Sequence, residues 1–174
     1  EAAHKIVLTA FEQRLKAVNF ASLLSEWAKQ SAAYYGWGSI KYFLFEYELE
    51  LLAKSKTARE KLSWAEFANE KFEEDYQTVE HIYPQKATDE CWRERCNVYP
   101  IRQRNILRNS LGNLLPLSKP KNSSLRNKCF VDKLGDDVRK VGYRYGCYSE
   151  IEVSQAKDWT PEEILTLKNP LRKL

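Results

Sequence analysis

The stretch "VEHIYPQ", residues Val79 to Gln85, decides how the fold of this sequence is interpreted. It contains His81, one of two histidines in the chain, with the carboxylate Glu80 directly before it and Pro84 three places after it. Alternating side chains and β-branched residues predict a short strand over residues 76–82, which Pro84 ends. Taken alone, His81 is either a buried structural histidine or a base that activates water.

Length and composition limit the class of protein. The 174 residues are 43% hydrophobic and 30% charged, which is typical of one soluble globular domain or of a small domain with an extension. The sequence shows neither an apolar run of membrane-spanning length nor a secretory signal pattern, so we expect a cytoplasmic protein that does not enter a membrane. The chain begins at "EAAHK" and contains no Met, so we expect a fragment of a longer protein.

Charge is distributed unevenly along the chain, whose overall net charge is +4. Residues 91–144 hold thirteen Lys and Arg against four Asp and Glu, a net charge of +9, whereas residues 1–90 hold eleven against fifteen, a net charge of −4. A basic second half is typical of a surface that binds a polyanion such as DNA, although a solvated charged face has the same composition.

The four cysteines, Cys91, Cys96, Cys129 and Cys147, include no C-x-x-C pair. Because nothing in the sequence indicates export, we expect reduced thiols rather than disulfides. A zinc site made from all four cysteines is a less favoured alternative, since the usual ligand pairs are missing.

The first 75 residues are predicted to be mostly helical. Apolar residues recur at helical spacing over residues 5–30, and Asn19 is expected to break this stretch by capping a second helix. A further helix is predicted to begin at Ser39 and another at the capping box "SWAE", residues 63–66. The apolar face of the Ser39 helix is expected to consist of Tyr42, Phe45, Leu49 and Leu52.

After the first strand, short helices are predicted in the basic segment of residues 85–112, beginning near Thr88 and Pro100. "NLLPL", residues 113–117, predicts a second strand, and a helix is then expected from about Asn122 to Leu134. The "TPEE" capping box, residues 160–163, predicts the last helix.

This order resembles the core of the HNH, or His-Me finger, nucleases: a strand with Glu-His, a long loop, a strand with Asn-Leu, and a helix with Asn. Three separate pieces match in order and spacing. The matching residues are Glu80-His81-Ile82 and Pro84, then Gly112-Asn113-Leu114 and Leu117, then Asn122, nine places after Asn113.

The chain is more closely similar to the C-terminal nuclease module of GmrSD-type restriction systems, including SspE-like phage-defence proteins. "EHIYPQ", "LGNLLPLS", "NSSLRNK" and the late Trp159 carry this resemblance, which covers most of the chain. The resemblance implies a partner domain that hydrolyses nucleotides, lies N-terminal to the nuclease, and is missing from this fragment.

The resemblance implies a role for each matching residue. His81 would be the general base, Glu80 and Asn122 would hold one Mg²⁺ or Mn²⁺ ion, and Asn113 would support the site by tying the loop to the strand pair. This set suits phosphodiester hydrolysis, which needs an activated water and a hard cation with oxygen ligands. The residues predicted to contact DNA phosphates are Lys121, Arg126, Lys128, Arg104 and Arg108.

The chain departs from the HNH pattern in two places. Glu80 stands where many relatives have the shorter Asp, and Ser118 and Lys121 stand where many have zinc-binding cysteines, so no structural zinc is expected. Purely structural roles for Glu80 and Asn122 also stay open. Glu80 could pair with an Arg of the basic segment, and Asn122 could be only a helix cap.

We therefore predict an α+β fold: a helical support region over residues 1–75, then an HNH-like ββα-metal nuclease domain over residues 76–174 with a helical insert and a C-terminal helix. The predicted function is a metal-dependent DNA endonuclease or nickase, the effector part of a restriction or anti-phage defence protein. The alternative is a DNA-binding or regulatory module that has the nuclease fold without cutting.

Overall fold

The structure is a computed structural model that describes residues 9–10, 13, 19–57, 59–68 and 78–166. It combines helices with one small antiparallel sheet, which confirms the predicted α+β class. The elements are α2 (Phe20–Ala28), α3 (Ile40–Lys54), α4 (Trp64–Ala68), β1 (Thr78–His81), α5 (Glu90–Cys96), α6 (Ile101–Arg108), β2 (Leu114–Leu117), α7 (Lys119–Leu125), α8 (Phe130–Lys133), α9 (Tyr148–Val153) and α10 (Pro161–Thr166), with short 3-10 helices at Leu111–Asn113 and Tyr143–Tyr145.

The sheet consists of β1 and β2, and its register runs from Thr78 opposite Leu117 to His81 opposite Leu114. Both predicted strands are confirmed within the described residues, although residues 76 and 77 lie outside them. Pro116 in β2 lacks an N–H group, which a two-stranded sheet tolerates because each strand has one unpaired edge. The register places His81 at the end of β1, beside the start of β2.

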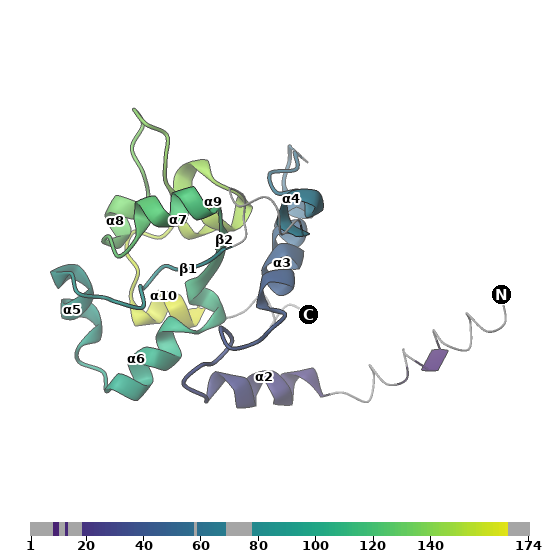
Figure 1. The fold of residues 1–174 in the computed structure, drawn as a ribbon, viewed down its shortest axis with the longest axis horizontal. Helices are drawn as coiled ribbons and strands as arrows, with labels where there is room; N and C mark the ends of the chain where they lie inside the picture. The colour runs from purple at the N-terminus through teal and green to yellow at the C-terminus, as the bar shows by residue number, and fades with distance from the viewer. Residues whose placement is uncertain (1–8, 11–12, 14–18, 58, 69–77, 167–174) are drawn as a thin grey trace.

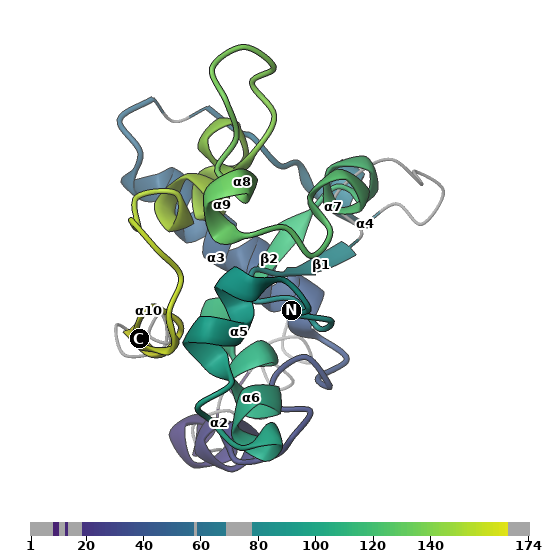
Figure 2. The ribbon, with the colours of Figure 1, turned by 90° about the vertical axis from the view of Figure 1, so that its left-hand side faces the viewer.

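Helices cover this sheet from two sides. Figures 1 and 2 show α7, α8 and α9 on one side of the strands and α5, α6 and α10 on the other, with α3 running alongside β2. The main core contains residues from the helices on both sides, and it includes the fully buried rings of Trp92, Tyr143 and Trp159. The sheet is therefore enclosed by residues that come mostly from the second half of the chain.

A second cluster of buried residues joins the N-terminal helical part to the sheet. Ile40 and Leu44 of α3 pack with Leu111 and with Leu114 of β2. The proposed division of the chain at residues 75 and 76 stays a prediction. The packing places α3, which precedes that boundary in the sequence, directly against β2, which follows it.

Side-chain hydrogen bonds confirm two of the helix starts that the sequence predicted. The Asn19 side chain accepts a hydrogen bond from the Ser22 amide (3.0 Å) and caps α2. The Thr160 amide donates to Glu163 Oε2 (3.0 Å), and Pro161 is the first residue of α10. In both cases polar side chains satisfy amides that the first helical turn leaves without backbone partners.

The buried face of α3 differs from the predicted one. Ile40, Leu44, Phe45 and Glu48 are buried, whereas Tyr42 is 52% exposed. Glu48 accepts hydrogen bonds from the first two amides of α9, one of them at 2.9 Å. The contact of this carboxylate with α9 fixes which face of α3 is buried. Apolar periodicity alone does not predict such a contact.

The predicted helix from Asn122 to Leu134 is wrong in its bounds. α7 begins at Lys119, with Pro120 in its first turn, and ends at Leu125 because Arg126 adopts a left-handed backbone (φ +45°). A separate helix, α8, begins at Phe130. Asn122 therefore lies within α7, not at its start, so the reading of Asn122 as a helix cap is also wrong.

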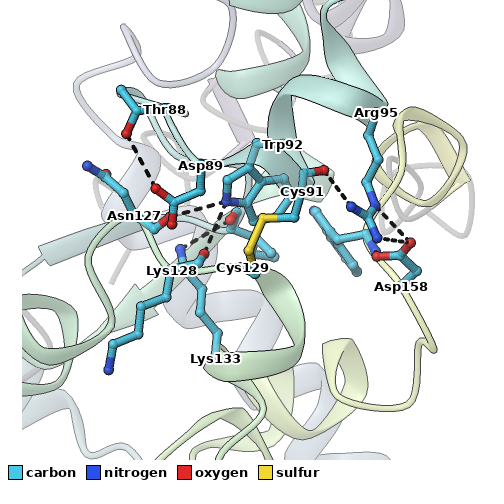
Figure 3. The surroundings of a disulfide bond; sticks show 12 residues. Thr88, Asp89, Cys91, Trp92, Arg95, Asn127, Lys128, Cys129, Lys133 and Asp158 are labelled. Atoms are coloured by element: carbon cyan, nitrogen blue, oxygen red, sulfur yellow. Dashed lines mark hydrogen bonds and ion pairs between the residues drawn. A yellow bond between two sulfur atoms is a disulfide. The ribbon is translucent and has the colours of Figure 1, made fainter.

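The expectation of reduced thiols is wrong for two of the four cysteines. Cys91 in α5 and Cys129, just before α8, form a disulfide, while Cys96 and Cys147 are free and buried. Figure 3 shows that Trp92, next to the disulfide, donates its indole N–H to the carbonyls of Asn127 and Lys128 (3.2 and 3.1 Å). The loop between α7 and α8 is thus fastened to α5 by both a covalent bond and hydrogen bonds.

We expect the paired substitution Cys91→Ser and Cys129→Ser to lower the free energy of unfolding by about 2 to 4 kcal/mol, because the disulfide closes a long loop in the unfolded chain. Urea denaturation with and without a reductant measures this. The reductant should lower the midpoint of the wild type and leave that of the paired variant unchanged. Equal wild-type midpoints under both conditions would contradict a stabilising disulfide.

Candidate active site

An open hollow of about 200 Å³ lies at the end of β1. Its lining includes Glu80 and His81 of β1, Asn122 of α7 and Arg126, which follows α7. These residues come from two stretches of the sequence, 80–81 and 122–126, and α7 brings them together by packing against β1. The hollow therefore collects an acid, an imidazole, an amide and a guanidinium at one surface.

His81 is the imidazole of this hollow and is only 7% exposed. Its Nε2 lies 3.2 Å from Asn109 Oδ1, and the ring of Tyr35 stands edge-on to it at 4.4 Å between centroids. Burial lowers the pKa of His81 from 6.5 to about 4, although the hydrogen bond with Asn109 opposes this shift. The imidazole is therefore neutral at physiological pH and able to accept a proton.

This burial predicts a pH-dependent stability. Between about pH 6.5 and about pH 4 the unfolded state binds a proton on His81 that the folded state does not, so acidification favours unfolding. We expect the wild type to lose about 2 kcal/mol more than His81→Gln between about pH 7 and about pH 5. Urea denaturation at both pH values measures the difference, and equal losses would show that His81 is not a buried neutral imidazole.

Glu80 is 4% exposed and is held by two residues from distant segments. Lys133 of α8 donates to Glu80 Oε1 at 2.6 Å, and the Tyr143 hydroxyl donates to the same oxygen at 2.9 Å. Burial raises the pKa of Glu80 and lowers the pKa of Lys133, and each opposite charge counteracts the shift of its partner. Of the readings left open by the sequence, an ion pair of Glu80 is present, but its partner is Lys133 and not an Arg of the basic segment.

Lys133 also holds the end of β1. Its ammonium is fully buried and donates to the backbone carbonyls of His81 (3.2 Å) and Ile82 (3.1 Å), besides Glu80. All three donors of the ammonium are thereby used next to the candidate base. The sequence motifs indicated no role for Lys133 or Tyr143, because a single sequence carries no signal that pairs them with Glu80.

Two glycines allow Lys133 and Tyr143 to meet at Glu80. Gly135 and Gly142 both have left-handed backbones (φ +90° and +147°), and a Cβ atom on Gly142 would lie 2.4 Å from the Cα of Gly135. Only glycine permits this approach. The chain between these glycines leaves the core as a protruding loop, visible above α8 in Figure 1, and returns beside its own start.

Asn113 is fully buried beneath the hollow. Its Oδ1 accepts from the Tyr83 amide (2.7 Å) and from Trp159 Nε1 (3.0 Å), while its Nδ2 donates to the carbonyls of Tyr83 (2.9 Å) and Arg108 (2.8 Å). The amide group of one side chain therefore joins the loop after β1, the end of α6 and the segment before α10. This geometry suits support of the site rather than contact with a substrate.

Asn122 sits over β1. Its Nδ2 donates to Thr78 Oγ1 (2.9 Å), and Thr78 Oγ1 donates in turn to the carbonyl of Leu117 (2.6 Å). Because the nitrogen end of the amide is used by Thr78, the oxygen end is the one left for a cation.

These residues fit a single Mg²⁺ or Mn²⁺ ion. Such cations take oxygen ligands and use one or two protein groups, together with water and substrate phosphate. Lys133 and Tyr143 both contact Oε1 of Glu80, and the carboxylate has a second oxygen. Within the described part of the chain, no group of three or more His, Cys, Asp and Glu side chains could hold a metal, so the amide of Asn122 and a phosphate would complete the ligand set.

The five cations assigned to DNA have different surroundings. Arg126 and Lys128 are exposed, and Arg126 lines the hollow. Lys121 instead pairs with the buried carboxylate of Glu150. Arg104 donates to Asn97 (2.6 Å), and Arg108 lies over the ring of Tyr83 and donates to its hydroxyl (3.1 Å). Arg126 and Lys128 are thus the members of this set best placed to meet a phosphate.

A neutral imidazole beside a carboxylate, an amide and a basic side chain, at the end of a two-stranded sheet, is the kind of site that hydrolases use to activate water. The family model for the C-terminal domain of GmrSD restriction endonucleases matches residues 22–174, and the chain belongs to this family. Membership indicates a nuclease domain of the restriction type, which in this family is the C-terminal domain of the protein. Neither the search of curated proteins nor the search of solved structures found a match. None of the described helices is long and apolar enough to cross a membrane.

Proposed function

We propose that this domain is a metal-dependent HNH-type DNA endonuclease or nickase, with His81 as general base and a single Mg²⁺ or Mn²⁺ held by Glu80 and Asn122. The observation that carries the proposal is the meeting of these three residues at one hollow, in a member of a restriction endonuclease family. The domain would act in the cytoplasm as the effector part of a defence protein.

The residues divide the work of hydrolysis between them. Neutral His81 would take a proton from a water molecule as that water attacks the scissile phosphorus. Asn113 and Lys133 would keep the imidazole in place, since they fasten the backbone from the carbonyl of His81 to the amide of Tyr83. A bound divalent cation would supply charge stabilisation at the phosphoryl and leaving oxygens. Cleavage would leave a 5′-phosphate and a 3′-hydroxyl.

DNA would lie across α7 and the loop that follows it. Arg126 at the hollow and exposed Lys128 would contact phosphates and set the position of the scissile bond. Lys121, Arg104 and Arg108 would add to the positive field, but each already has a partner within the domain. We also propose, from the family membership, that a nucleotide-hydrolysing domain N-terminal to this one is its partner.

Cleavage of supercoiled plasmid tests the proposal. The protein should convert the plasmid to nicked or linear product with Mg²⁺ or Mn²⁺ and leave it intact with EDTA. Ligation of the product, before and after phosphatase treatment, should show a 5′-phosphate. Salt-dependent DNA binding without cleavage under any metal condition would instead favour the alternative, a non-cutting DNA-binding module.

A further inference from the structure

Asn109, the C-cap of α6, connects the imidazole of His81 to the segment of residues 31–35. The Asn109 amide donates to the carbonyl of Asn105 (3.1 Å), and its carbonyl accepts from the Tyr34 amide (3.1 Å). Its side-chain Nδ2 donates to the carbonyl of Ser31 (2.7 Å). Hydrogen bonds other than the one to His81 therefore hold both the backbone and the side chain of Asn109.

These contacts fix which atom of the Asn109 amide faces His81. The Ser31 carbonyl only accepts hydrogen bonds, so the atom next to it must be the Asn109 nitrogen. The oxygen, Oδ1, is then the atom 3.2 Å from His81 Nε2. An amide oxygen has no proton to give, so a hydrogen bond between these two atoms requires the proton on Nε2.

The neighbours of the imidazole agree with this assignment. The Tyr35 ring lies edge-on at 4.4 Å and limits rotation of the imidazole. Gln85 Nε2 lies 3.4 Å from the same His81 nitrogen, but this side chain is exposed and its amide is free to turn its oxygen inward. Asn109 has no such freedom, because Ser31 holds its nitrogen.

We propose that Asn109 is a positioning residue that fixes neutral His81 in the tautomer with the proton on Nε2, so that Nδ1 is the atom that takes a proton from water. The choice of Nδ1 as the base rests on the proposed function, whereas the tautomer itself does not. Because residues 31–35 hold Asn109 and contact the ring, the N-terminal helical part contributes to the orientation of the base.

Nitrogen NMR of the imidazole tests the tautomer directly. The chain has two histidines, so His4→Gln in the full 174-residue chain leaves His81 as the only imidazole. In protein labelled with ¹⁵N-histidine at about pH 8, where imidazoles are neutral, long-range ¹H–¹⁵N spectra distinguish a protonated nitrogen from a bare one. We expect a protonated Nε2 and a bare Nδ1. A protonated Nδ1 in this folded protein would overturn the proposal.

Substitutions at Asn109 test whether this residue fixes the tautomer of His81. Asn109→Ala removes the acceptor and should populate the Nδ1-protonated tautomer, whereas Asn109→Asp keeps an acceptor oxygen and should retain the Nε2-protonated one. Asn105→Ala, one turn earlier on α6, is the matched control and should leave the spectrum unchanged. An Asn109→Ala spectrum identical to that of the parent would overturn the role of Asn109. If Asn109→Ala does not fold, Asn109→Asp decides, and loss of the Nε2-protonated form there overturns the role.

Cleavage kinetics give a separate readout. Asn109→Ala should lower kcat roughly 10- to 100-fold with little change in KM, the usual cost of losing a group that orients a histidine. A protein that shows the expected tautomer but cleaves no DNA would contradict the proposed function and leave the assignment of the tautomer intact. A rise in KM together with a fall in kcat, with an unchanged spectrum, would overturn the positioning role.

Discussion

His81→Ala is expected to reduce metal-dependent cleavage of plasmid DNA by about 10²- to 10⁴-fold, the range usual for loss of a general base. The imidazole lines the hollow with Glu80 and Asn122, and burial lowers its pKa to about 4, so it is neutral at the pH of the assay, the protonation state that a general base needs. Initial rates of plasmid nicking at saturating Mg²⁺ measure the effect.

His4→Ala is the matched control, since it makes the same change at the other histidine of the chain. Cleavage by this variant should equal that of the wild type, and DNA binding by both variants, measured by fluorescence anisotropy, should be unchanged. Equal nicking by wild type and His81→Ala would remove His81 from the role of base.

Lys133→Met is expected to lower the free energy of unfolding by about 3 to 5 kcal/mol, because it leaves the carboxylate of Glu80 buried without its counter-charge. Glu80 is 4% exposed and Lys133 is 0% exposed, so the side of the carboxylate that faces Lys133 is closed to water. The same change also removes the donors to the carbonyls of His81 and Ile82. Urea denaturation at neutral pH measures the loss.

Two further variants show whether the loss comes from this ion pair. Lys128→Met changes an exposed lysine in the loop before α8 and should alter stability by less than about 0.5 kcal/mol. Combining Glu80→Gln with Lys133→Met should cost clearly less than the sum of the two single changes, since the combination buries no unpaired charge. Similar losses for Lys128→Met and Lys133→Met would contradict a buried ion pair at Glu80.

The parts of the fold that local sequence dictates were predicted correctly. β1 follows from alternation in "TVEHI" together with Pro84, and the caps at Asn19 and Thr160 follow from side chains that satisfy amides within three residues. The start of α7 was predicted three residues late, although Pro120 is a recognised signal for a first helical turn. The end of α7 at Arg126 has no such signal, because its left-handed backbone is imposed by the surrounding structure.

The contacts that define the surroundings of the candidate site could not be predicted in the same way. Glu80 meets Lys133 across 53 residues, and His81 meets Asn109 across 28. Side-chain periodicity indicates which face of an element is buried, but not which distant polar group it meets there. The disulfide was missed for a related reason, since composition suggests a compartment and says nothing of which two cysteines approach each other.

The proposed function depends on where the cation binds, and anomalous diffraction from Mn²⁺ locates it most directly. His81→Ala keeps the two proposed ligands while blocking cleavage, so crystals of this variant with duplex DNA and Mn²⁺ would hold the uncut complex. We predict one anomalous peak at the hollow, bound by Glu80 and by the amide oxygen of Asn122, beside the position of residue 81. A Mn²⁺ peak on the DNA-bound protein that contacts neither Glu80 nor Asn122 would contradict it.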